Sequence, residues 1–146
     1  MKSLPIVLIC VVFFNLNGLI AQQSNNTIIK NVTINSFELE SEIVMSDAIL
    51  VGSPTINQNT LLPVYKLFSL INPLRDKSKI AGAFGSYGWS GEAPKIITDS
   101  LRNLKLKVFE ESIALKFFPG DEKASALKDY GRRFAAYVLA ECDNKT

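Results

Sequence analysis

The sequence alternates short, continuous apolar runs with longer segments of helical periodicity, and this alternation constrains the fold more than any other feature. The run "AILVG" (48–52) precedes a segment of helical spacing, and a second apolar run, "KIAGAFG" (79–85), follows that segment. Continuous apolar runs are typical of parallel strands that are covered on both faces. Strands that alternate with helices predict an α/β fold with a doubly wound parallel sheet and helices on both faces.

The remaining segments fit the same alternation. "IIKNVTINSF" (28–37) is rich in β-branched residues and predicts a strand, whereas the acidic run "ELESE" (38–42) is typical of an exposed loop. An extended stretch is expected over 104–118. We expect a helix over 61–71, capped by Thr60 and with Pro63 in its first turn.

Two further helices complete the pattern. One is expected from about Ala93, with Ile97, Leu101 and Leu104 on one face. Asp121 is a candidate cap for the last helix. The apolar face of that helix is expected to bury Leu127, Phe134 and Val138.

Composition excludes several classes of function. The chain has 146 residues, of which 47% are hydrophobic and 21% charged, as expected of one globular domain. A net charge of +2 gives no support for nucleic-acid binding, and the absence of histidine excludes histidine-dependent triads and the usual imidazole metal sites. The two cysteines, Cys10 and Cys142, form no CxxC pair. We therefore expect no metal site.

The N-terminal segment allows two interpretations. A lysine, an apolar core from Leu4 to Phe14 and the small residues before Ala21 have the layout of a secretory signal peptide cut after Ala21. Alternatively, the apolar residues within 1–22 form the first buried strand of a domain that extends over 28–140. The sequence leaves both interpretations open.

Both apolar runs end in loops rich in glycine, serine and aromatic residues. "GSPT" (52–55) follows the first run, and "GSYGWSGE" (85–92) follows the second. Parallel strands of one sheet end at the same edge, which is where such sheets bind ligands. Small residues allow backbone N–H groups to approach a ligand, and Tyr87 and Trp89 offer flat faces. These loops predict a site for a planar ligand rimmed with polar groups, such as a flavin.

The segments "SDAILVGSPTINQNTLLPVYKLFSLI" and "KIAGAFGSYGWSGEAPKIITDSL" resemble the flavodoxin-like domain of flavodiiron proteins (A-type flavoproteins) over roughly Val44 to Val138. In that family the two loops enclose FMN. The resemblance therefore implies that the chain has a flavodoxin-like fold, binds FMN as cofactor and carries no catalytic residues. The implied cofactor-binding residues are Ser53, Pro54, Thr55, Ile56 and Asn57 from the first loop, and Phe84, Gly85, Ser86, Tyr87, Gly88, Trp89 and Gly91 from the second.

The chain departs from the family pattern in two places. The family's hydroxyl-rich phosphate loop and long helix after the first strand are not recognisable in "FFNLNGLIAQQSNNTIIKN" (13–31). The family's histidine-rich di-iron module is also absent, and with it the residues for reducing oxygen or nitric oxide.

The resemblance implies an FMN-binding electron-transfer domain that serves a redox partner, either a reductase or a terminal acceptor, in the cytoplasm. Such a chain is an electron carrier rather than a self-sufficient oxidoreductase. The alternative is a truncated flavodoxin-like domain without cofactor, kept as a structural or interaction module or as a gene remnant.

Overall fold

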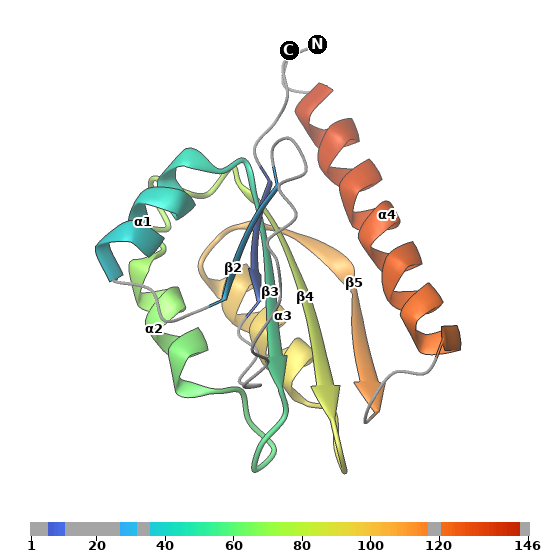
Figure 1. The fold of residues 1–146 in the computed structure, drawn as a ribbon. Coiled ribbons are helices and arrows are strands. Elements are labelled where there is room, and N and C mark those ends of the chain that lie inside the picture. The colour runs from blue at the N-terminus through green and yellow to red at the C-terminus, as the bar shows by residue number, and fades with distance from the viewer. Residues whose placement is uncertain (1–5, 11–26, 32–35, 117–120, 144–146) are drawn as a thin grey trace.

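A five-stranded, wholly parallel sheet forms the centre of the molecule in the computed structural model (Figure 1), which describes residues 6–10, 27–31, 36–116 and 121–143. Its strands lie in the order β2-β1-β3-β4-β5. This is the strand order of flavodoxin-type doubly wound sheets, so the expected fold class is confirmed. The strand bounds are β1 Ile6–Cys10, β2 Thr27–Asn31, β3 Ala48–Pro54, β4 Ile80–Tyr87 and β5 Lys107–Lys116.

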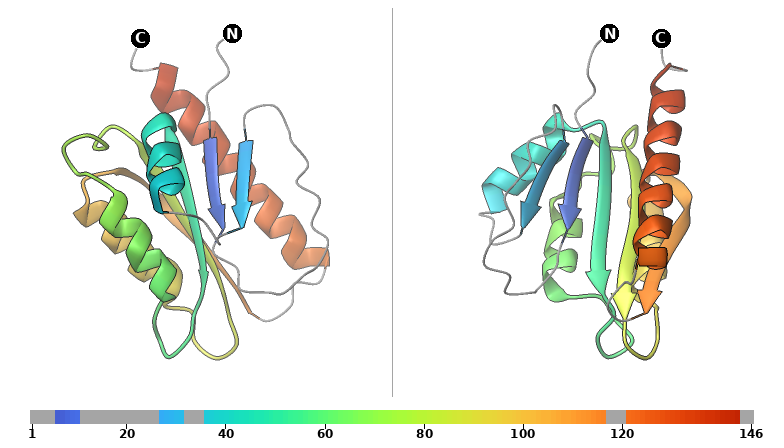
Figure 2. Two further views of the ribbon diagram at one scale, coloured as in Figure 1. Left: turned by 60° about the vertical axis from the view of Figure 1, so that its left-hand side comes forward. Right: turned by 45° about the vertical axis from the view of Figure 1, so that its right-hand side comes forward.

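Helices cover both faces of the sheet, as the two views in Figure 2 show. Buried side chains of α1 (Ser36–Met45), α2 (Leu62–Leu70) and α3 (Ala93–Asn103) share one core cluster with β3 and β4. The opposite face is covered by α4 (Asp121–Asp143), whose buried residues pack on the other side of β3 and β4. None of the described helices is long and apolar enough to cross a membrane.

The N-terminal apolar segment forms β1, which lies between β2 and β3 in the sheet. β1 pairs with β2 on one side and with β3 on the other, with Ile6 opposite both Thr27 and Ala48. Ile6–Cys10 is therefore part of the sheet, in agreement with the strand interpretation. The signal-peptide interpretation gains no support from this arrangement, and its cut after Ala21 lies outside the described residues.

The acidic run at 38–42 is helical, so the expected exposed loop is wrong. It lies within α1, where Leu39 and Ile43 are buried one turn apart and Glu40 pairs with Arg75. Two apolar residues at this spacing give the helix a face to bury, and that face outweighs the acidic composition. The strand expected over 28–37 is also shorter than predicted, because β2 ends at Asn31 and Ser36 already belongs to α1.

The helices lie close to the expected positions, but the predicted Thr60 cap is wrong, and Asp121 is the first residue of α4 rather than the residue before it. Leu61 is the N-cap of α2, not Thr60, and no side chain caps that helix. The Oγ1 atom of Thr60 is instead buried without a hydrogen-bond partner among the described residues. The last helix begins at Asp121 and buries Phe134 and Val138, whereas Leu127 is only partly buried.

Tyr130 is the largest fully buried side chain, and it joins α4 to an irregularity between β4 and β5. The pairing shifts there, because Ala81 lies opposite Val108 whereas Ala83 lies opposite Ser112. The Tyr130 hydroxyl lies 2.8 Å from the carbonyl oxygen of Ala83 and 3.3 Å from that of Glu111. Burial raises the pKa of Tyr130 to about 12, so the hydroxyl stays protonated and donates at this kink.

Replacing Gly131 with alanine is expected to raise the free energy of unfolding by about 0.5–1 kcal/mol. Gly131 lies inside α4, and a Cβ atom there would meet nothing within 4 Å. Urea denaturation measures the change. Gly82→Ala is a control of opposite sign, because its Cβ would lie 2.7 Å from Cε2 of Phe134. A destabilised Gly131→Ala variant would contradict this account of α4.

Candidate functional site at the carboxyl edge of β3 and β4

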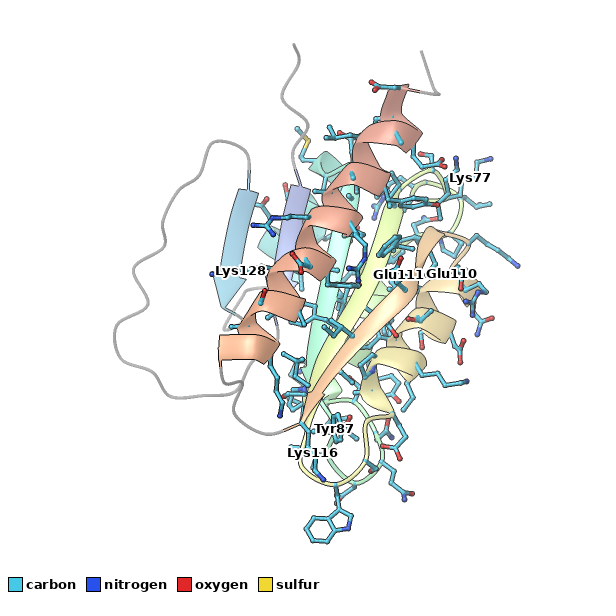
Figure 3. All side chains as sticks on the ribbon, turned by 90° about the vertical axis from the view of Figure 1, so that its right-hand side faces the viewer. Lys77, Tyr87, Glu110, Glu111, Lys116 and Lys128 are labelled. Carbon is cyan, nitrogen blue, oxygen red and sulfur yellow. The ribbon has the colours of Figure 1, made fainter. Side chains whose placement is uncertain are left out.

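The sheet reverses its strand order between β1 and β3, and ligands of such sheets bind outside the carboxyl ends of the strands at this point. β3 and β4 are neighbours in full register, with Pro54 opposite Ser86. The two predicted loops therefore leave the sheet side by side, as expected. Figure 3 shows Tyr87, at the end of β4, beside Lys116, at the end of β5, with Lys77 at the opposite end of the molecule.

Both strands extend further than the sequence suggests, which corrects the predicted start of each loop. β3 continues through Ser53 and Pro54, and β4 continues through Gly85 and Ser86 to Tyr87. Pro54 has no N–H to donate to β4. The pairing of the two strands nevertheless continues past Pro54, because the Thr55 N–H donates to the Ser86 carbonyl oxygen at 2.7 Å. The site therefore stands on a hydrogen-bonded sheet edge, and only the residues beyond Pro54 and Tyr87 form loops.

The hydroxyl groups of Ser53 and Thr55 form hydrogen bonds to the backbone of the protein. Ser53 Oγ donates to the carbonyl oxygen of Pro54 at 2.9 Å and accepts from the Leu61 N–H at 3.2 Å. Thr55 Oγ1 accepts from the Ala93 N–H at 3.1 Å. Ser53 thus ties the end of β3 to the start of α2, and Thr55 ties it to the start of α3.

The first loop turns tightly at Asn57 and Gln58. Both residues have positive φ angles, 52° and 58°. Ile56 and Asn59 flank them and exchange two backbone hydrogen bonds of 3.0 Å, as in a type I′ turn. The Oδ1 atom of Asn59 accepts from the Thr60 N–H and from the Tyr65 hydroxyl. The turn is therefore held from within, and Ile56 and Asn57 are exposed at its tip.

The second loop, residues 88–92, exposes an indole ring. Trp89 is 95% exposed, the highest value among the large apolar side chains of the described residues. Tyr87 is half-buried against Gly91, where an added Cβ would lie 3.1 Å from its ring. An exposed tryptophan at a ligand-binding edge offers a flat apolar face to a ring that stacks on it.

Phe84 differs from its neighbours in the second loop because its partly buried ring packs against the core cluster. Phe84 is opposite Gly52 in the β3–β4 register and packs with the cluster under α4. A Cβ added at Gly52 would lie 2.2 Å from Cζ of Phe84, so this glycine makes room for the ring.

Backbone donors remain available in both loops. Within the described part of the chain, the N–H groups of Asn57 and Gln58 and those of Trp89, Ser90 and Gly91 donate to no other group. These residues are exposed or only partly buried, so either water or a ligand with several acceptor atoms can pair with their N–H groups.

Glu92 is the one ionisable residue of the second loop. The Oε2 atom of Glu92 is buried and has no hydrogen-bond partner among the described residues. Across the described part of the chain, no three His, Cys, Asp or Glu side chains gather in a way that could hold a metal ion. What the arrangement offers is backbone hydrogen bonding and aromatic stacking. The region after β1, residues 11–26, where the resemblance implies the phosphate loop, lies outside the described residues.

Comparison with known proteins identifies the family, although no protein-family model matches the sequence. The flavo-diiron protein FprA2 of Clostridium acetobutylicum is 38% identical over 101 residues, which are 69% of this chain and 25% of the relative. The chain belongs to the flavodiiron protein family. It spans about a quarter of the length of that curated relative.

Solved structures show the same fold for this flavodiiron-family chain. The rubredoxin oxygen:oxidoreductase of Desulfovibrio gigas superposes with a TM-score of 0.76 at 23% identity, covering 95% of this chain and 38% of the other. A flavodoxin from the domain Archaea superposes with a TM-score of 0.70 at 24% identity, covering 93% of this chain and 99% of the other. Both matches show that the chain has a flavodoxin-like fold.

Sequence reasoning located the edge of the site but overlooked Ala93. The N–H of Ala93 is the partner of the Thr55 hydroxyl, 38 residues away in sequence. The available signal was the start of a helix directly after the second loop, marked by Pro94. The assignment of the twelve loop and strand-end residues to FMN remains a prediction.

Proposed function

We propose that this chain is an FMN-binding, flavodoxin-like domain that carries electrons to or from a protein partner. The observation that carries the proposal is the pair of adjacent loops at the carboxyl edge of β3 and β4, with unpaired backbone donors and an exposed Trp89. Bound FMN would supply reversible one- or two-electron transfer.

The two loops would enclose the ring from opposite sides. Ser53 to Asn57 would line one side, with the exposed Ile56 and the Asn57 N–H nearest to the ligand. Gly85 to Trp89 and Gly91 would line the other, with the N–H groups of Trp89 and Gly91 as donors and the indole as a stacking face. The protein would tune the potential through these hydrogen bonds and this stacking.

The partner is proposed from the family. One structural relative is named a rubredoxin oxygen:oxidoreductase, so a small electron-carrier protein is a fitting partner for this chain. The same proposal places the chain in the cytoplasm, as the family resemblance implies.

Replacing Trp89 with alanine is expected to weaken FMN binding by about five- to a hundredfold, because one stacking face is lost. Stability should change by less than about 0.5 kcal/mol, since the side chain is 95% exposed. Titration of FMN fluorescence gives the dissociation constant. Trp89→Phe keeps a flat ring and should retain most of the affinity.

The matched control is Leu74→Ala. The Leu74 side chain is 85% exposed, and the residue lies in the turn between α2 and β4, away from both loops. It should bind FMN like the wild type. Equal FMN affinities for the wild type and Trp89→Ala would show that the indole does not contribute to FMN binding. Absence of binding in a folded wild type would instead favour the cofactor-free interaction module.

A further inference from the structure

We propose that Thr55 is a positioning residue. By accepting a hydrogen bond from the start of α3, it would fix the first loop relative to the second, and these are the two loops proposed to hold FMN. The inference rests on the proposed function, because it concerns the loops that would hold the ring. It gives Thr55 a task different from direct contact with the ligand through its side chain. The juxtaposition that carries it is the Thr55 Oγ1 atom and the Ala93 N–H, 3.1 Å apart.

The helix α3 does not cap itself. Its N-cap is Glu92, whose side chain makes no capping hydrogen bond and whose backbone is already helical, with φ −75° and ψ −27°. The first N–H groups of a helix have no partner within the helix. Pro94 has no N–H, and Ile96 donates to the Glu92 carbonyl oxygen, so Ala93 and Lys95 remain in the first turn.

The Ala93 N–H needs an acceptor because it is buried. Ala93 is 0% exposed, so water cannot replace a lost partner. A buried N–H without a partner costs about 1–3 kcal/mol. Thr55 supplies an acceptor for the N–H of the first helical residue, a donor that an N-cap side chain, which accepts from the second or third residue, leaves without a partner.

Thr55 forms hydrogen bonds on both sides of the second loop. Its N–H donates to the Ser86 carbonyl oxygen at 2.7 Å, at the end of β4. Its hydroxyl reaches Ala93, at the start of α3. The loop 88–92 lies between these two attachment points, so one residue of the first loop fixes both ends of the second.

The first test is made without FMN. Amide exchange of Ala93, measured by NMR, should be about tenfold faster in Thr55→Val, which is isosteric but offers no acceptor. Thr55→Ser keeps the oxygen and should match the wild type. Thr55→Ala provides a second variant without the acceptor, should valine impair folding.

The second test measures FMN binding in the same proteins. Thr55→Val should bind FMN about three- to tenfold more weakly, and Thr55→Ser should restore the affinity. Thr60→Val is the matched control, because the same substitution removes a buried hydroxyl that has no hydrogen-bond partner among the described residues. It should leave both Ala93 exchange and FMN affinity unchanged.

The outcomes separate this inference from the proposed function. Unchanged Ala93 exchange in Thr55→Val overturns the cap, whether or not the protein binds FMN. Faster exchange with unchanged FMN affinity overturns the coupling between the loops. A folded wild type that binds no FMN overturns the proposed function and the ligand-holding part of this inference, and Ala93 exchange still decides the cap.

Discussion

Asp76→Ala is expected to lower the free energy of unfolding by about 3 kcal/mol, because it leaves a cationic cluster without its buried anion. Asp76 is 0% exposed and accepts hydrogen bonds from the Asn72 N–H at 2.9 Å and from two guanidinium nitrogens of Arg75 at 2.9 and 3.0 Å. Its second cationic neighbour is Lys79, whose Nζ lies 3.9 Å from Oδ1. Chemical denaturation measures the loss.

A control uses the other carboxylate on the same arginine. Glu40 pairs with Arg75 at 3.1 Å, but its side chain is 46% exposed. Exposed ion pairs contribute about 0–1 kcal/mol, so Glu40→Gln should have a small effect. Equal losses for Glu40→Gln and Asp76→Ala would contradict a structural role for the buried carboxylate.

Asp76 also predicts a pH dependence. Burial raises the pKa of Asp76, but the hydrogen bonds from Arg75 and Asn72 and the charges of Arg75 and Lys79 outweigh burial and lower it overall. A carboxyl whose folded pKa is depressed stabilises the fold above its unfolded value of about 3.9. This stability is lost as the pH falls through the folded pKa. Asp76→Asn should remove this part of the acid dependence, and an unchanged acid profile would contradict it.

Gly85→Ala is expected to cost about 2–3 kcal/mol and to weaken FMN binding by about tenfold or more. An added Cβ would lie 2.5 Å from the carbonyl oxygen of Ser53 and 2.9 Å from Cγ of Pro94. The first contact is backbone, so β3 and β4 must separate at the base of both loops. Thermal unfolding and FMN titration measure the two effects.

Gly91→Ala is the comparison for that variant. Its Cβ would lie 3.1 Å from the ring of Tyr87, a half-buried side chain rather than backbone, so a small shift of the ring relieves the contact. The expected loss of stability is below about 0.5 kcal/mol. Similar losses for Gly85→Ala and Gly91→Ala would show that the β3–β4 contact is less tight than the structure indicates.

The sequence predicted the sheet and the adjacency of the two loops at one of its edges, because both follow from local patterns. Continuous apolar runs such as Ala48–Val51 mark strands covered on both faces, and parallel strands must end at one edge. The helix start at Ala93 and the buried positions Ile97 and Leu101 likewise follow from periodicity within one segment.

The errors arise where distant contacts decide the structure. The acidic run at 38–42 became helical because Leu39 and Ile43 pack beneath the sheet. The apolar N-terminus has the same composition as a signal peptide, and only its pairing with β2 and β3 distinguishes the strand. The partner of Thr55 lies 38 residues away, and although Pro94 marks the start of that helix, the local sequence does not show that its first N–H pairs with Thr55.

The most direct measurement is the visible spectrum of the purified full-length chain after it has been mixed with FMN and desalted. We expect flavin absorption bands to stay with the protein and flavin fluorescence to be quenched, because loop donors and Trp89 would hold the ring. A colourless protein with the circular dichroism of a folded α/β domain would contradict this expectation.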